Sequence, residues 1–205
     1  MRVCRRASDF SGPLELFRYR GHWQLATQNA IYSDGAAYTP LLKAYGTLGK
    51  PFLVQCNSVL VLGTGLGSAV TLLQKKYGLR PPVTLLDIDE AVLEWAIDCL
   101  EDEGHGDHVE VICDDAQHFF EVDDRRWDLL IIDLFKGQTV PEFATQKPFL
   151  EAAWTQVSDG GALVMNYIVQ VNANWEALQR TLLEVTGREP QVVRHGVNCI
   201  VVVRN

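Results

Sequence analysis

The sequence predicts an α/β protein with a doubly wound, mostly parallel seven-stranded sheet and a small N-terminal β-hairpin region. The first observation is a short, apolar run at residues 59–62, which a glycine-rich turn follows at Gly63, Gly65 and Gly67. The second is that such runs alternate with segments of helical periodicity, which predicts parallel strands joined by right-handed crossovers. The third is the size, because 205 residues, of which 47% are hydrophobic, suffice for one good core.

The hairpin region and a linking helix are expected to occupy residues 1–48, and the α/β domain residues 49–205. Residues 1–12 carry three arginines and little apolar pattern, so we expect a frayed end without a function of its own. The elements expected next are strands at residues 14–19 and 23–31, and a helix at residues 36–48 that ends at Gly49-Lys50-Pro51.

Strands and helices then alternate along the α/β domain, and a final hairpin closes one edge of the sheet. This hairpin is expected because only His195-Gly196 separates the last two apolar runs. The expected strands are residues 59–62, 83–87, 109–112, 128–133, 163–167, 191–194 and 197–203. The expected helices are residues 67–77, 90–102, 115–121 and 175–186.

Composition limits the kinds of partner. A formal net charge of −8 argues against a nucleic-acid or membrane-surface partner, because such surfaces are bound by clustered positive charge. The chain has no apolar run of about 18 residues, the length that a membrane span needs. Its five cysteines are scattered without C-x-x-C spacing, which predicts neither a disulfide framework nor a zinc site. We therefore expect a cytoplasmic protein that acts on a small molecule and holds no metal.

Acidic residues follow the predicted strands, at the sheet edge where ligands bind in such folds. Asp87 comes about 20 positions after Gly67, the spacing at which a carboxylate accepts hydrogen bonds from ribose hydroxyls. Asp89 is the alternative, although its position favours a cap on the following helix. In the pair Asp114-Asp115, one carboxylate is expected to cap a helix, and one is placed to accept a bond from an adenine amino group.

Asp133 ends the strand in WDLLIIDLFKG and is the acid most typical of a functional site, because burying a charge is costly. The glycine turn fits a dinucleotide fingerprint only in part, since Ser68 takes the third small position and no basic residue lies near. Acids at three strand ends favour a ligand with hydroxyl and amino donors and a positive centre. S-adenosylmethionine is such a ligand.

Four segments in register resemble the spermidine synthase family and its methyltransferase-like relatives: LVLGTGLGS, LLDIDEAVLEWA, VICDDAQHFF and WDLLIIDLFKG. The resemblance covers the chain from about Tyr38 to the C-terminus, and it implies a Rossmann-like fold of the class I methyltransferase type. It also implies a homodimer. The cofactor-binding residues that it implies are Gly63, Gly65, Leu66 and Gly67 for the methionine part, Asp87 and Ile88 for the ribose, and Asp115 and Ala116 for adenine.

The same resemblance implies that Asp133 is the catalytic acid, which contacts the cofactor and takes a proton from the attacking amine. Tyr38 matches a substrate-side tyrosine of the family. Lys136 stands where the family has a second aspartate that holds the diamine, and a lysine there would repel a polyamine. Leu66 stands where the family has an acid that contacts the ammonium of decarboxylated S-adenosylmethionine.

These two departures favour S-adenosylmethionine itself over its decarboxylated form, because an acid at position 66 would repel the cofactor's carboxylate. The sequence therefore predicts a methyltransferase that acts on a small-molecule acceptor. The alternatives are a polyamine aminopropyltransferase that uses decarboxylated S-adenosylmethionine, and a binder of the cofactor without catalytic activity.

Overall fold

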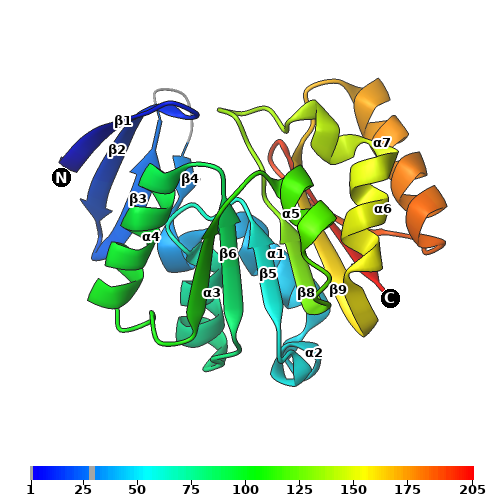
Figure 1. Cartoon of the computed structure of the whole chain (residues 1–205), viewed down its shortest axis with the longest axis horizontal. Helices are drawn as coiled ribbons and strands as arrows, with labels where there is room; N and C mark the ends of the chain where they lie inside the picture. Colours follow the sequence, from blue (N-terminus) through cyan, green and yellow to red (C-terminus); the bar gives the residue numbers. More distant parts are fainter. Residues whose placement is uncertain (1, 28–30) are drawn as a thin grey trace.

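Two β-sheets organise the molecule, which a computed structural model describes at residues 2–27 and 31–205 (Figure 1). The larger sheet has seven strands in the order β10-β11-β9-β8-β5-β6-β7. Its bounds are β5 (Val59–Leu62), β6 (Val83–Asp87), β7 (Val109–Cys113), β8 (Trp127–Ile132), β9 (Val157–Ile168), β10 (Gln191–His195) and β11 (Asn198–Arg204). Strands β5 to β9 pair in parallel, whereas β11 pairs antiparallel with β9 and β10. The predicted fold class is confirmed.

Helices cover both faces of this sheet, and each face has its own apolar core. Successive residues of β5 point to opposite faces, so Val59 and Val61 lie in one core and Leu60 and Leu62 in the other. Helices α1 (Thr39–Leu48), α2 (Lys50–Gln55) and α3 (Ser68–Leu72) cover the first core. Helices α5 (Ala116–Val122), α6 (Lys147–Thr155) and α7 (Asn172–Thr186) cover the second.

The smaller sheet lies beside α4 (Glu90–Asp102), at the end of the molecule opposite to α6 and α7 (Figure 1). It is antiparallel, with β1 (Arg2–Ser8), β2 (Gly12–Tyr19), β3 (His22–Ala26) and β4 (Ile31–Ser33) in sequential order. Buried leucines of β2 and β3 pack on α4 through Trp95. Part of the predicted strand at 23–31, residues 28–30, lies outside the described residues.

The expectation of a frayed N-terminus at residues 1–12 was wrong. Strand β1 pairs along its length with β2, from Arg2 opposite Phe17 to Ser8 opposite Gly12. Side chains also tie this strand to α4, because Arg6 forms an ion pair with Glu94 and the Ser8 hydroxyl donates to Asp89. Pairing with a neighbouring strand therefore orders a segment whose own sequence lacks an apolar pattern.

Several predicted elements differ from those observed. The helix expected at 67–77 is divided into α3 and a π-helical turn, η2 (Leu73–Tyr77), and the strand expected at 163–167 extends over the whole of β9. Helix α2 was not predicted, because Gly49-Lys50-Pro51 was taken as a stop, whereas Pro51 lies in its first turn. Helix α6 was not predicted either, and it too has a proline in its first turn. Two 3-10 turns, η1 (Gly35–Ala37) and η3 (Glu142–Thr145), complete the elements. Within the described residues, no helix combines the length and apolar character that crossing a bilayer requires.

Candidate functional site

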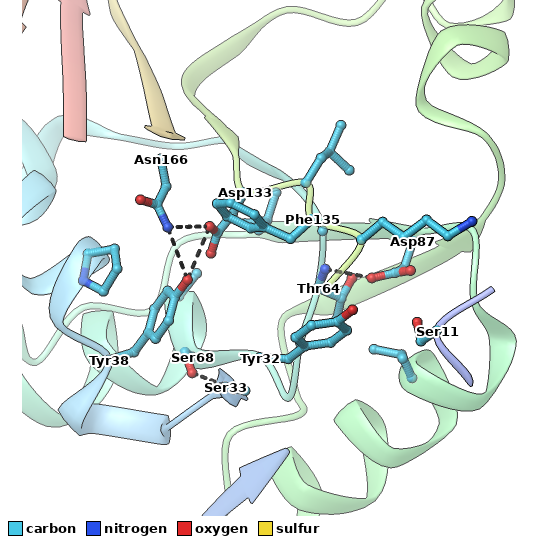
Figure 2. A pocket seen from close by; sticks show the side chains of 18 of the residues that line it. Ser11, Tyr32, Ser33, Tyr38, Thr64, Ser68, Asp87, Asp133, Phe135 and Asn166 are labelled. Atoms are coloured by element: carbon cyan, nitrogen blue, oxygen red, sulfur yellow. Dashed lines mark hydrogen bonds between the residues drawn. The ribbon is translucent and has the colours of Figure 1, made fainter. Parts of the chain in front are cut away.

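A cavity of about 600 Å³ opens at the carboxyl ends of β5, β6 and β8, between the two sheets. Figure 2 shows two groups of polar side chains in it: Thr64 and Asp87 on one side, and Asp133, Tyr38 and Asn166 on the other. The predicted residues that line this cavity are Gly63, Gly65, Asp87, Ile88, Asp115, Ala116, Asp133, Tyr38 and Lys136. We call the first side the donor end and the second the acceptor end, after the cofactor and the small-molecule acceptor that the sequence predicts.

The glycine turn brings the ends of β5 and β8 into close contact. A Cβ atom at Gly63, which has a φ of +88°, would lie 2.3 Å from the carbonyl oxygen of Asp133. Only glycine fits there, because both the space and the positive φ exclude a side chain. Gly67 has a different role, since a Cβ there would lie 2.7 Å from Leu100 of α4. Gly67 is not among the residues that line the cavity, so its predicted contact with a ligand stays a prediction.

Leu66 also lies away from the cavity. Its side chain is buried among Leu14, Leu16 and Leu25 of the small sheet. The positive φ of Gly65, +53°, and that of Gly67, +73°, flank Leu66 in the turn. The predicted cofactor contact of Leu66 is therefore corrected: the residue fastens the glycine turn to the small sheet.

Backbone amides hold Asp87 at the donor end. Its Oδ2 accepts from the Thr64 amide at 2.9 Å, and its Oδ1 from the Asp89 amide at 3.1 Å. Burial raises the pKa of Asp87 to about 6, and the amide bonds oppose that rise. Asp89 caps α4 instead, accepting from the Ala91 amide at 3.1 Å, which confirms the predicted cap. Asp87 is thus the acid of this pair that faces the cavity.

The pair Asp114 and Asp115 lines the same end of the cavity, beside Ala116. Asp115 caps α5, because its Oδ1 accepts from the Gln117 amide at 2.7 Å. The Asp114 carboxylate accepts from the Asp115 amide at 2.8 Å and lies 2.7 Å from the His118 ring. Asp115 therefore both caps α5 and lines the cavity.

Side chains from distant parts of the chain hold Asp133 at the acceptor end. Its Oδ1 accepts from Asn166 Nδ2 at 2.9 Å and from the Tyr38 hydroxyl at 3.1 Å. Asn166 Nδ2 also donates to the Tyr38 hydroxyl, at 3.2 Å (Figure 2). A carboxylate only accepts, so this network fixes the orientation of the Asn166 amide. Burial raises the pKa of Asp133 to about 6, and the two donated bonds oppose that rise.

Tyr38 remains protonated in this network. Burial and the neighbouring Asp133 carboxylate raise the pKa of its phenol well above the usual value. Tyr38, which the resemblance places on the substrate side, lines the cavity.

Asn166 is a residue that sequence analysis missed. It sits in β9 within the apolar run ALVMNYI, and only 3% of it is exposed. The pairing of Ile132 with Met165 places it beside Asp133 across the two parallel strands. A lone amide in a buried strand is the signal that could have revealed it.

The loop after Asp133 carries Lys136, an exposed residue, to the lining of the cavity. Lys136 and Thr139 close a tight turn, with N–H to carbonyl distances of 2.9 and 3.2 Å in the two directions. The Gly137 amide donates to the Tyr32 hydroxyl at 2.7 Å, which joins this loop to the small sheet. Tyr32 is a second residue that the sequence did not reveal.

Comparisons with known proteins identify the family and the fold. The family model of the spermine/spermidine synthase domain matches residues 37–199. A solved spermidine synthase in complex with the transition state analogue AdoDATO has a TM-score of 0.72 at 14% identity, over 99% of this chain and 73% of that one. A probable spermidine synthase from Corynebacterium glutamicum has a TM-score of 0.75 at 15% identity, over 98% and 80%.

A more distant likeness extends to methyltransferases. The 16S rRNA N2 G1207 methyltransferase of T. thermophilus, in complex with AdoMet and guanosine, has a TM-score of 0.65 at 16% identity, over 94% of this chain and 50% of that one. At such identities the structural likenesses establish the fold. No curated protein matches the chain.

Proposed function

The chain belongs to the spermine/spermidine synthase domain family, and on that premise we propose that it is an aminopropyltransferase acting on a small amine. The donor in this proposal is decarboxylated S-adenosylmethionine. The observation that carries it is the Asp133, Tyr38 and Asn166 network, which lies in the cavity directly across from Asp87 (Figure 2). The comparisons support the same class, since the similar structures include a spermidine synthase bound to AdoDATO.

The prediction of methyl transfer loses one of its two supports. It depended on Leu66 facing the methionine part of the cofactor, and Leu66 packs on the small sheet instead. Lys136 remains as the second support, because it brings a cation to the cavity. Methyl transfer from S-adenosylmethionine is therefore the second candidate.

The residues of the donor end fit an adenosyl sulfonium. Asp87 would offer carboxylate oxygens to the ribose hydroxyls, and Asp115, which lines the same end of the cavity, would accept from the adenine amino group. Gly63 lines the cavity and lets the end of β5 lie directly against the Asp133 backbone, which keeps the two acids at one sheet edge. No lysine or arginine other than Lys136 lines the cavity in the described part of the chain, which disfavours a pyrophosphate.

When bound, the sulfonium supplies an electrophilic carbon, so that an amine lone pair forms a C–N bond while the C–S bond breaks and its electrons stay on sulfur as a neutral thioether. The protein aligns the amine and removes its proton. Asp133 receives that proton, because its carboxylate is the acid at this end and is ionised at neutral pH given a pKa of about 6. Tyr38 and Asn166 hold the carboxylate in place by donating to one oxygen, which leaves Oδ2 for the amine.

One experiment tests both candidates through the thioether that is released. The protein is incubated with either donor and a panel of amines, and the products are analysed by mass spectrometry. Aminopropyl transfer from decarboxylated S-adenosylmethionine releases 5′-methylthioadenosine, whereas methyl transfer from S-adenosylmethionine releases S-adenosylhomocysteine. We expect 5′-methylthioadenosine, and we expect it to be absent with Asp133→Asn. Donor binding without either thioether, across the whole panel, would contradict the proposed activity.

A further inference from the structure

The charges that line the cavity are almost all negative. The acidic residues among them are Asp9, Asp34, Asp87, Asp114, Asp115 and Asp133. Against these acids, Lys136 is the only lysine or arginine that lines the cavity among the described residues. Most of the acids already accept hydrogen bonds from the protein, as Asp34 does from Gln24 at 2.6 Å. Lys136 differs from them, because no ion pair within the described chain involves it.

Hydrogen bonds hold Lys136 and the three residues that follow it at several points. The turn to Thr139 closes on itself, and Gly137 donates to the Tyr32 hydroxyl at 2.7 Å. Gln170, which follows β9, also contacts this loop: its Nε2 donates to the Gln138 carbonyl at 3.1 Å and to Thr139 Oγ1 at 3.2 Å. The lysine is thus anchored three residues after Asp133, while its long side chain is free to reach a ligand in the cavity mouth.

We propose that Lys136 is the carboxylate-binding group of this cavity. An unpaired ammonium on a fixed loop attracts an anion. A carboxylate is the anion that S-adenosylmethionine or an amino-acid acceptor would bring to it, whereas the decarboxylated donor of the proposed function brings none. The same charge disfavours a second ammonium, so the distal end of the acceptor is anionic or neutral rather than cationic. The inference rests on the proposed function only for the identity of the donor and of the acceptor.

The carboxylate has two possible sources. One is the methionine carboxylate of S-adenosylmethionine, which the decarboxylated donor lacks. The other is a carboxylate on the acceptor, which would then be an amino acid rather than a diamine. The two sources predict different responses to substitution of Lys136, so one set of variants separates them.

The first arm measures donor binding by calorimetry, without turnover. Dissociation constants for S-adenosylmethionine and for decarboxylated S-adenosylmethionine are compared in the wild type, Lys136→Gln and Lys136→Glu. If the donor supplies the carboxylate, the ratio of the two constants shifts toward the decarboxylated donor by about three- to tenfold in Lys136→Gln, and further in Lys136→Glu. Lys43→Glu is the matched control, because Lys43 is an exposed residue of α1 that does not line the cavity.

The second arm measures acceptor binding in the presence of 5′-methylthioadenosine. The acceptors compared are 4-aminobutanoate and 1,4-diaminobutane, which have equal chain lengths and opposite distal charges. If the acceptor supplies the carboxylate, the wild type prefers 4-aminobutanoate, and Lys136→Glu reverses the preference. Improved binding of the diamine cannot result from misfolding, so the reversal is informative even for a less stable variant.

A shift of the expected sign in either arm, absent in Lys43→Glu, supports a carboxylate site at Lys136 and identifies its source. The proposal would be overturned if the ratios of dissociation constants, for the two donors and for the two acceptors, stayed within about twofold of the wild type. An equal loss of affinity for all four compounds would overturn it as well. Neither arm requires turnover. Failure to release a thioether would therefore contradict the proposed activity while leaving this test of Lys136 intact.

Discussion

The two ends of the cavity hold a carboxylate of similar pKa in different ways. At the donor end, Asp87 accepts from two backbone amides, those of Thr64 and Asp89. At the acceptor end, Asp133 accepts from two side chains, Tyr38 and Asn166, which lie 95 and 33 positions away in the sequence. Burial raises the pKa of both acids to about 6. In the proposed function, backbone therefore builds the part that binds the donor, and side chains build the part that reacts.

This difference has a functional consequence. Backbone amides fix Asp87 wherever the turn and the strand are formed, so the donor end depends on the fold itself. The acceptor end depends on three side chains and can change its chemistry by substitution, with the sheet unaltered. Substitutions at the donor end should therefore change donor affinity, and substitutions at the acceptor end should change turnover.

The largest effect is expected for Asp133→Asn. The substitution keeps an acceptor for Tyr38 and Asn166 but removes the base, so we expect kcat to fall by about 100- to 10,000-fold. Donor affinity should change by less than about threefold, because Asp87 and the glycine turn are untouched. Steady-state kinetics and calorimetry measure the two quantities. A large loss of donor affinity with little change in kcat would reverse the assignment of the two ends.

The same substitution is expected to stabilise the protein. The folded-state pKa of Asp133 is raised from the usual 3.8 to about 6. The favourable contribution of this group to the free energy of unfolding is therefore fully present below pH 3.8 and is lost as pH rises through 6. At about pH 8, Asp133→Asn should therefore raise the free energy of unfolding by on the order of 2 kcal/mol. Urea denaturation at two pH values measures the gain, which should vanish near about pH 4. A lower free energy of unfolding for the variant than for the wild type at the higher pH would show that burial of the Asp133 charge does not destabilise the fold.

Asp87→Asn is expected to act on binding instead. It replaces a charged acceptor of ribose hydroxyls by a neutral amide, so donor affinity should fall by about 10- to 100-fold. At saturating donor, kcat should stay within about threefold of the wild type. The matched control is Asp89→Asn, which alters the cap of α4 outside the cavity lining and should leave donor affinity nearly unchanged. Equal losses in both variants would indicate a structural effect.

Tyr38→Phe should produce the smallest change, a shift in pH dependence. The value of kcat/KM should fall as pH drops through about 6, because protonated Asp133 cannot accept the proton. The Tyr38 hydroxyl lowers the pKa of Asp133, so its removal should move this acid limb to higher pH by roughly half a unit to one unit. The pH profile of kcat/KM checks the shift. An unmoved limb would mean that another group is the base.

The sequence predicted the donor end better than the acceptor end, for physical reasons. The bounds of β5, β6 and α4 were predicted correctly, because their apolar patterns and the Asp89 cap are local signals. Strand β1 was missed because only its pairing with β2 and its contacts with α4 order it. Local patterns do not contain such tertiary contacts.

The same limit applies to the side chains of the site. Asp87 and Asp133 were identified because strand ends converge at one sheet edge. Asn166 was missed because its place beside Asp133 depends on the register of β8 and β9. Leu66 was misplaced because its direction depends on the positive φ angles of the glycines on either side.

The central claim is that strand-end carboxylates beside a bare glycine turn bind an adenosyl thioether or sulfonium rather than a dinucleotide. Calorimetric titration of the unmodified protein with 5′-methylthioadenosine and with NAD⁺ tests it most directly. We expect saturable binding of 5′-methylthioadenosine and no measurable heat with NAD⁺. Binding of NAD⁺ without binding of the thioether would contradict it.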